Sequence, residues 1–476
     1  MVMYRQTIGL EVHAELKTRT KMFCDSANNP DEIRPNVNVC PICLAHPGTL
    51  PVINREAVRH VIRLGTAVGG TIADYSEFDR KSYFYPDIPK GYQISQYKHP
   101  LVKGGTLAGV AITRVHLEED TARSIHSSGK TLIDFNRAGI PLMELVTEPV
   151  IHDAETAGAF ARELQLLLRT LGAGEANLEK GEMRIEANIS VAPKYQEPSA
   201  KNQTSTKSHM GTKVEVKNLN SFRSVERAIA YEIERQSALI ESGDKVVQET
   251  RGWDEAKQQT FHQRFKEGSA DYRYFPEPDL PSLRLFEVPE FATETLRATL
   301  PELPWERRAR YREQLGLQRD DVEYLLAGPT RTAFFEAVVD ELDGQSELVV
   351  RAANYFISDL AGEPGKATPT AFAALIRMFA AGGLSSRGAK SILAVLVEQG
   401  GDPNAIAKER GLLQISDSRV LAEIVDTVIT REVEAVRQYR TGSVAVLQYL
   451  VGKAMQESRG AGNPQTFRHL FETKLT

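Results

Sequence analysis

Cysteine is scarce in this sequence, with three among 476 residues. Three thiols cannot build a disulfide framework, so reduced cysteines or metal ligands are expected. Long hydrophobic runs are also missing, because no stretch approaches the ~20 apolar residues that a membrane-spanning helix needs. The N-terminus enters a strand pattern at once, without the apolar core of a secretion signal. We therefore expect a cytoplasmic protein with no membrane span.

An excess of positive charge is absent as well, because the formal net charge is -5. This excludes a globally basic nucleic-acid binder, so any nucleic acid must meet a local basic patch. The clearest patch covers residues 435–476, which contain six basic and two acidic residues.

A Walker phosphate-binding loop is the third absence. The segment SSGKT at 127–131 has the right end, but Ser124 stands where the first glycine should be. If the chain binds ATP, another arrangement must hold the phosphates.

The character of the sequence changes along the chain. Up to about Leu280 it reads as strands and turns, and from Pro289 it is rich in Ala, Leu, Glu and Arg at helical spacing. A Gly-Gly-Asp-Pro stretch at 400–403 indicates a second break. We predict an α+β protein of three parts: a β-rich domain over 1–288, an all-α domain over 289–403 and a small helical tail over 404–476.

Four predicted strands alternate apolar and polar residues. In IGLEVHAEL at 8–16, the apolar side chains share one face, and Glu11 and His13 lie on the other. The same alternation gives further polar faces, formed by Arg114, His116 and Glu118 within 110–120, by Arg184, Glu186 and Asn188 within 183–191, and by Lys213, Glu215 and Lys217 within 212–218. Each strand alone is typical of a mainly antiparallel sheet with one solvated face.

Taken together, the four strands could present several carboxylates and one imidazole to the same space. Carboxylates within ~4 Å repel one another strongly when partly desolvated, and a divalent cation relieves that repulsion. Oxygen-rich ligands with one nitrogen suit Mg²⁺ or Mn²⁺, and protein-bound Mg²⁺ usually serves nucleotide phosphates. The alternative is an ordinary solvated sheet face.

Basic and aromatic residues alternate in FDRKSYFYPDIPKGYQISQY, residues 78–97. Cations for phosphate, aromatic planes for a base and rigid turns would suit a nucleotide or the 3′ end of a tRNA. The candidate binding residues are Arg80, Lys81, Tyr83, Tyr85, Lys90 and Tyr92. An ordinary surface loop with aromatic anchors explains the composition equally well.

The cysteines allow a zinc site. Cys40 and Cys43 have the two-residue spacing of a zinc knuckle, and Cys24 lies upstream. A structural zinc takes four ligands, so Asp25, His46 or water would have to complete the set. Free thiols are the alternative.

Eight segments resemble, in order, the family of B subunits of bacterial aspartyl/glutamyl-tRNA(Asn/Gln) amidotransferases. They are IGLEVHAEL, CPICLAHPGTLPVIN, DRKSYFYPDIPKGYQISQY, HLEED, NRAGIPLMELVTEP, EVKNLNSFRSVERAIAYEIERQ, QETRGWDEAK and DYRYFPEPDLP. The resemblance covers nearly the whole chain. It implies a β-rich cradle domain with the kinase and transamidase site, then a helical domain and a small helical tail that contacts tRNA.

The activity implied by the resemblance is ATP-dependent. The side-chain carboxylate of Glu-tRNA(Gln) or Asp-tRNA(Asn) is phosphorylated, and ammonia then displaces phosphate to give Gln-tRNA(Gln) or Asn-tRNA(Asn). The implied cofactors are ATP and Mg²⁺. The implied partners are the glutaminase A subunit of the amidotransferase, its small C subunit, which clasps the other two, and the misacylated tRNA.

The resemblance also implies site residues. The Mg²⁺ ligands carried over by motif are Glu11, His13, Glu118, Glu119, Glu186 and Glu215. The first four are also the implied catalytic residues, and strand parity favours Glu118 over Glu119. In the tail, the candidate tRNA contacts are Arg437, Arg440, Lys453 and Arg459. Two rival hypotheses are a non-catalytic tRNA-binding scaffold and a stand-alone metal-dependent hydrolase.

Overall fold

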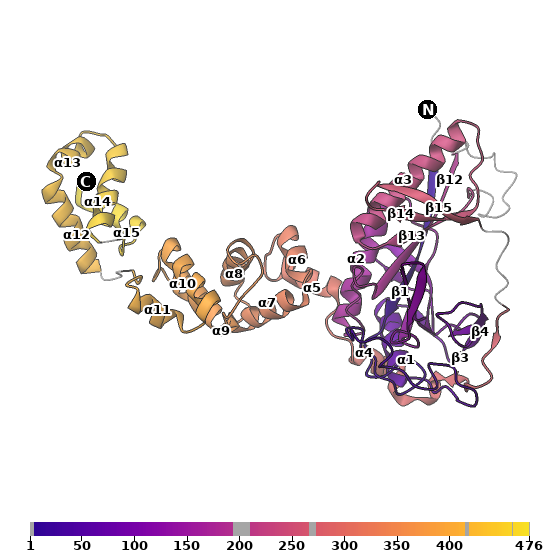
Figure 1. Cartoon of the computed structure of the whole chain (residues 1–476). Coiled ribbons are helices and arrows are strands. Elements are labelled where there is room, and N and C mark those ends of the chain that lie inside the picture. The colour runs from indigo at the N-terminus through magenta and orange to yellow at the C-terminus, as the bar shows by residue number, and fades with distance from the viewer. Residues whose placement is uncertain (1–3, 194–209, 266–272, 415–417, 459, 476) are drawn as a thin grey trace. The chain divides into compact units, whose positions relative to one another are not determined.

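The computed structural model describes residues 4–193, 210–265, 273–414, 418–458 and 460–475. The chain forms two compact units, Met1–Pro304 and Trp305–Thr476. Unit 1 carries all the strands of the described residues, and Figure 1 shows the coiled helices that make up the described part of unit 2. The prediction of an α+β protein is confirmed. The division into three parts stays a prediction.

A ten-stranded sheet dominates unit 1. Its strands, in spatial order, are β15 (Gln259–Phe265), β14 (Glu249–Asp254), β13 (Val214–Leu219), β12 (Met183–Pro193), β1 (Tyr4–Glu15), β11 (Pro141–Thr147), β8 (Val110–Glu119), β6 (Val102–Lys103) and β2 (Thr71–Ile72), with β7 (Thr106–Leu107) also paired to β8. Only the β13–β14 pair is parallel among the pairings of this sheet in the described residues. The sheet is therefore mainly antiparallel, as the alternating sequence pattern predicts.

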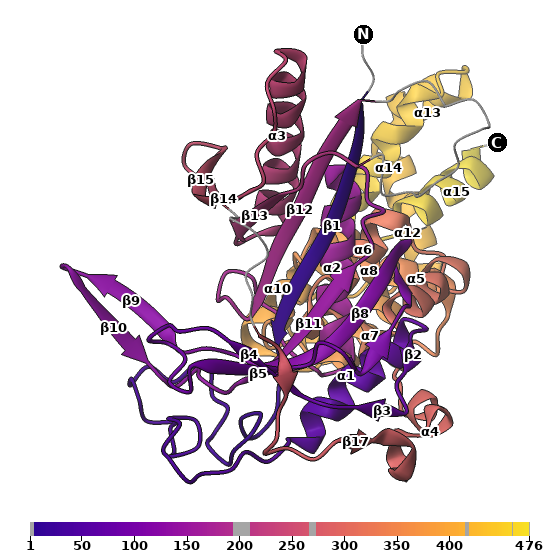
Figure 2. The ribbon, with the colours of Figure 1, turned by 90° about the vertical axis from the view of Figure 1, so that its right-hand side faces the viewer.

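Three small sheets complete the β structure of unit 1. They are β9 (Arg123–Ser127) with β10 (Lys130–Asp134), β16 (Phe275–Pro276) with β4 (Asp79–Ser82) and β5 (Tyr92–Ser95), and β17 (Leu283–Arg284) with β3 (Tyr75–Ser76). Figure 2 shows β9 and β10 as a hairpin that extends away from the large sheet.

The apolar side chains of β1 form part of the core. Ile8, Leu10, Val12 and Ala14 are each at most 1% exposed. Burying a side chain of this size stabilises the fold by roughly 1.5–3 kcal/mol, apart from the smaller alanine. The helices of unit 1 are α1 (Arg55–Ala67), α2 (Ala154–Thr170), α3 (Phe222–Glu241) and α4 (Thr293–Ala298), and α3 packs against β12 and β13.

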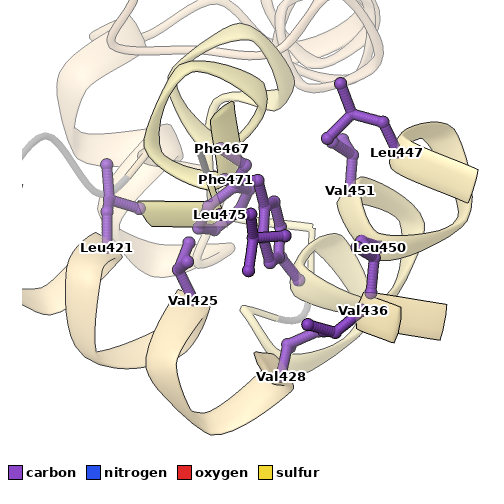
Figure 3. Packing of buried hydrophobic residues seen from close by; sticks show 11 residues of the cluster. Leu421, Val425, Val428, Val436, Leu447, Leu450, Val451, Phe467, Phe471 and Leu475 are labelled. Carbon is purple, nitrogen blue, oxygen red and sulfur yellow. The ribbon is translucent and has the colours of Figure 1, made fainter. Parts of the chain in front are cut away.

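The regular elements in the described residues of unit 2 are helices. Its helices are α5 (Pro304–Glu313, beginning at the boundary), α6 (Arg319–Leu326), α7 (Pro329–Glu341), α8 (Ser346–Ser358), α9 (Pro369–Ala380), α10 (Ser386–Gln399), α11 (Pro403–Glu409), α12 (Ser418–Arg431), α13 (Val433–Arg440), α14 (Ala445–Glu457) and α15 (Pro464–Leu475). Helices α12–α15 enclose a hydrophobic cluster of their own, in which Phe467 and Phe471 are fully buried (Figure 3). No described helix is both long and apolar enough to cross a membrane.

Candidate active site

Strand register brings the predicted polar faces together. Strand β1 lies between β12 and β11, and β8 pairs with the other edge of β11 (Figure 2). Glu11 stands opposite Glu186 on β12, and His13 stands opposite Glu144 on β11. Glu144 in turn stands opposite His116 on β8. Because directly opposed residues share a face of a sheet, four neighbouring strands contribute to one polar surface.

The centre of this surface is His13. Its Nε2 atom lies 3.4 Å from Glu118 Oε1, 3.5 Å from Glu144 Oε2 and 3.9 Å from Glu11 Oε1. Glu144 Oε2 also lies 3.3 Å from His116 Nε2. The structure therefore brings Glu11, His13 and Glu118 together, as predicted, and adds Glu144 and His116. We call these five residues the carboxylate cluster.

Burial and neighbouring charges set the protonation of the cluster. Burial acts to lower the pKa of His13, but its contacts with Glu118 and Glu144 raise that pKa well above the usual value. Burial acts to raise the pKa of Glu144, but His116 and His13 hold it well below its usual range. Burial, reinforced by the nearby Glu144 charge, raises the pKa of Glu11. Without a bound metal ion, the proton on the His13 imidazole neutralises part of the negative charge of the cluster.

The cluster fits a divalent cation. The ligand atoms of Glu11, His13 and Glu144 lie within 4.8 Å of one another, as do those of His116, Glu118 and Glu144. Glu118 Oε2 is buried and has no hydrogen-bond partner among the described residues. Carboxylate oxygens with imidazole nitrogen are a donor set that suits Mg²⁺ or Mn²⁺. The residues present are therefore suited to the predicted Mg²⁺.

The other predicted acidic ligands have different partners. Glu186 Oε1 accepts a hydrogen bond from Lys217 Nζ at 2.7 Å, and Glu215 Oε2 accepts one from Thr250 Oγ1 at 2.7 Å. Both lie on the polar face, one and two strands away from β1. Their role as metal ligands stays a prediction.

Glu119 contacts Lys90 and the backbone of Ile94 instead of His13. Its Oε1 atom lies 2.5 Å from Lys90 Nζ and accepts a hydrogen bond from the Ile94 backbone N–H at 3.0 Å. Adjacent residues of a strand point to opposite faces, which explains why Glu118 and Glu119 reach different partners. Parity alone therefore separates the two glutamates, in the direction that the sequence favoured.

The residues predicted to bind a nucleotide also have different partners. Arg80 forms a two-pronged salt bridge with the buried Glu277, at 2.8 Å for each nitrogen, and its guanidinium lies 4.2 Å from the centre of the Tyr92 ring. Both residues are thus engaged within the protein. Lys81 is different: burial acts to lower its pKa, but the charges of Glu118 and Glu144 raise it.

The two tyrosines that follow Lys81 differ in exposure. Tyr83 is half-buried, and burial raises its pKa. Tyr85 is 60% exposed, with its ring centre 5.9 Å from that of Tyr83 in an edge-on contact. Of the two, Tyr85 is the more accessible to a ligand.

The three cysteines cluster at one place. The sulfur atoms of Cys24, Cys40 and Cys43 all lie within 4.8 Å of one another. Ser26 Oγ lies 3.8 Å from Cys43 Sγ, and Nζ of the fully buried Lys21 lies 3.9 Å from it. Three thiols fit zinc chemically, with a fourth ligand still required. The zinc site stays a prediction.

The tail residues are exposed for the most part. Arg437 pairs with Glu434 at 2.8 Å, Arg440 is exposed, and Lys453 lies 3.4 Å from Glu432. Arg459 lies outside the described residues. No contact within the described chain shows what these side chains bind.

Sequence reasoning gave no role to Glu144 and His116. Strand parity placed His116 on the polar face, but its partner Glu144 was not singled out. The available signal was a single glutamate inside the otherwise apolar run PLMELVT, because a buried acid requires a compensating partner.

Residues 6–288 match the family described as "GatB/GatE catalytic domain", and residues 333–475 match "GatB domain". The chain is 44% identical over 482 residues to the B subunit of the aspartyl/glutamyl-tRNA(Asn/Gln) amidotransferase of Thermus thermophilus, covering 98% of both chains. It is 41% identical over 497 residues to the protein of the same name from Nitratidesulfovibrio vulgaris, covering 100% of both chains. The carboxylate cluster lies within the first matched region. This chain therefore belongs to the GatB/GatE family.

Proposed function

We propose that this chain is the subunit of a tRNA-dependent amidotransferase that carries its ATP-dependent transamidation site. The side-chain carboxylate of Glu-tRNA(Gln) or Asp-tRNA(Asn) is phosphorylated, and ammonia then displaces phosphate to leave the amide. Family membership over nearly the whole chain supports this role. The observation that carries the proposal is the position of His13 between Glu118 and Glu144.

Amide formation from a carboxylate needs activation, because hydroxide is a poor leaving group. The carboxylate cluster would hold Mg²⁺ through Glu11, His13, Glu118 and Glu144. The ion would supply charge neutralisation for the ATP phosphates and for the incoming carboxylate.

The chain's own residues supply positioning and exclude water. Lys81 places an ammonium beside Glu118 and Glu144, where it can offset the charge of a transferring phosphoryl group. Glu118 and Glu144 are 2% and 6% exposed, so this side of the cluster is shielded from solvent, while the Glu11 side chain is 31% exposed. Shielding matters because an acyl phosphate in open water is hydrolysed.

The reaction requires partners. We propose that the glutaminase A subunit releases ammonia from glutamine, that the small C subunit joins the other two, and that misacylated tRNA binds through the tail. Such an enzyme is a glutamine-hydrolysing, ATP-dependent carbon–nitrogen ligase. We propose that it works in the cytoplasm, where aminoacyl-tRNA serves translation.

The test uses the complete amidotransferase complex. Wild type is expected to cleave ATP only when Glu-tRNA(Gln) or Asp-tRNA(Asn) is present, and His13→Ala is expected to abolish this cleavage while tRNA binding persists. If His13→Ala cleaves ATP normally, the chain is a scaffold. If wild type cleaves ATP equally well without aminoacyl-tRNA, it is a hydrolase.

A further inference from the structure

The loop between β4 and β5 presents an aromatic ring to solvent. Phe84 is 87% exposed. A Cβ atom at Gly91 would lie 3.3 Å from Phe84 Cδ1 and Cε1, so one edge of the ring lies beside Gly91. Gly91 has a φ of 73°, a conformation that favours glycine. With 87% of the side chain exposed, the ring is open to solvent apart from this edge.

Backbone hydrogen bonds fix this loop. The Tyr83 N–H donates to the Gly91 carbonyl at 3.2 Å, the Ile88 N–H to the Tyr85 carbonyl at 3.1 Å, and the Gly91 N–H to the Ile88 carbonyl at 3.0 Å. The aromatic ring is thus carried on an organised turn. Because the backbone of the loop is already ordered, stacking of a planar group on the ring costs little backbone entropy.

The same loop leads to the carboxylate cluster. Lys81 interacts electrostatically with Glu118 and Glu144, and Phe84 follows three residues later. Tyr83, the residue before Phe84, also interacts electrostatically with Glu118, and consecutive Cα atoms are about 3.8 Å apart. In an aminoacyl-tRNA, about six bonds of roughly 1.5 Å separate the ribose oxygen from the side-chain carboxyl oxygen. Phe84 therefore directly follows a residue within electrostatic range of Glu118, and the amino acid carried by a nucleoside stacked on Phe84 would extend from there towards the cluster.

We propose that Phe84 is the stacking platform for the unpaired 3′-terminal adenosine of the aminoacyl-tRNA. The proposal rests on the proposed function, because it assumes that the reacting carboxyl arrives on a tRNA. Unpaired bases bind proteins chiefly by stacking on aromatic side chains. The platform then holds the terminal nucleoside while the attached amino acid extends towards Glu118 and Glu144.

The exposure of Phe84 favours RNA over the adenine of ATP. Small-molecule ligands usually have 70–90% or more of their surface buried in pockets. A ring that is 87% exposed is instead accessible to the end of a large molecule approaching from solvent. Tyr83 is the less accessible neighbour, since it is half-buried beside Lys81.

The experiment compares three variants of the complete complex: Phe84→Ala, Phe84→Trp and, as a matched control, Phe286→Ala. Phe286 is 65% exposed and belongs to the turn at Leu285–Glu287. Phe84→Ala is expected to raise KM for Glu-tRNA(Gln) by about tenfold or more, as for the loss of one base–aromatic stack, with KM for ATP changed less than twofold. Phe84→Trp and Phe286→Ala should stay close to wild type.

A binding measurement separates this inference from the proposed function. In a tRNA that carries 2-aminopurine as its terminal base, stacking on Phe84 should quench fluorescence without any turnover, and Phe84→Ala should abolish the quenching. An unchanged KM for aminoacyl-tRNA together with unchanged quenching would overturn the platform. An increase in KM for ATP alone would assign Phe84 to the nucleotide. Loss of amidation in wild type with quenching intact would overturn only the proposed function.

Discussion

His13 on β1 and Glu144 on β11 stand directly opposite each other in an antiparallel pair, with 3.5 Å between His13 Nε2 and Glu144 Oε2. On its other side, β11 pairs with β8, where His116 faces Glu144. Glu144 therefore joins the acidic residues of β1 to those of β8. Removing its charge should disturb both sides of the cluster at once.

The first prediction concerns Glu144. Glu144→Gln keeps the size of the side chain but removes its charge, so we expect aminoacyl-tRNA-dependent ATP cleavage to fall about 100-fold. Glu148→Gln is the matched control, because Glu148 accepts a hydrogen bond from Thr113 outside the cluster. Cleavage rates are measured with the complete complex at saturating tRNA. Equal rates for Glu144→Gln and the control would remove Glu144 from the site.

The second prediction concerns pH. The raised pKa of His13 means that the proton remains on the imidazole above the usual titration range. A bound metal ion requires the neutral imidazole, so binding must release that proton. Mn²⁺ affinity should therefore rise with pH until the His13 pKa is passed, and the raised pKa of Glu11 acts in the same direction.

Calorimetric titrations with Mn²⁺ at pH 6.5, 7.5 and 8.5 measure this dependence. The number of protons released is obtained by repeating each titration in buffers with different ionisation enthalpies. His13→Ala should bind more weakly and show a shallower dependence on pH. An affinity for wild type that is the same at all three pH values would contradict the assignment.

The third prediction concerns the ion pair between Lys90, which is partly buried, and the buried Glu119. Lys90→Met leaves the Glu119 carboxylate without its cation, so we expect a loss of about 3 kcal/mol in the free energy of unfolding. The double variant Lys90→Met with Glu119→Gln removes both charges and should recover part of that loss. The free energy of unfolding of unit 1 is measured for both variants by urea titration, followed by tryptophan fluorescence. If the double variant is less stable than Lys90→Met, the loss of stability does not come from leaving the Glu119 charge unpaired.

The fourth prediction concerns the tail. Arg437→Ala and Lys453→Ala should each weaken binding of tRNA and reduce by about one the slope of log affinity against log salt, because each removes one phosphate contact. Lys366→Ala is the control, since Lys366 is exposed but lies outside the predicted tail. Binding is measured by filter retention at several salt concentrations. If the salt slopes of Arg437→Ala and Lys453→Ala match that of the control, the tRNA does not bind through these two residues.

Much of the site could be predicted from single strands. The alternation in IGLEVHAEL placed Glu11 and His13 on the face opposite Ile8 and Leu10, and the structure has these two apolar side chains buried. Parity also favoured Glu118 over Glu119 as the metal ligand, and the structure has Glu118, not Glu119, beside His13. The strand faces could be predicted because the side-chain period of a strand is two wherever one face is buried.

The partners of the basic loop could not be predicted in this way. Arg80 forms its salt bridge with Glu277, 197 residues later in the chain, which no local pattern indicates. The role of Glu144 was equally hidden, because PLMELVT reads as a buried apolar strand. Both depend on pairings between segments that are far apart in the sequence.

The sequence by itself determined the mainly antiparallel character of the sheet, the helical C-terminal part, and the faces on which Glu11, His13 and Glu118 lie. These properties follow from the local periodicity of apolar residues, which fixes the buried side of each element. Only the tertiary structure decided that β11 lies between β1 and β8. That order, set by non-local strand pairing and core packing, makes Glu144 a shared neighbour of two histidines.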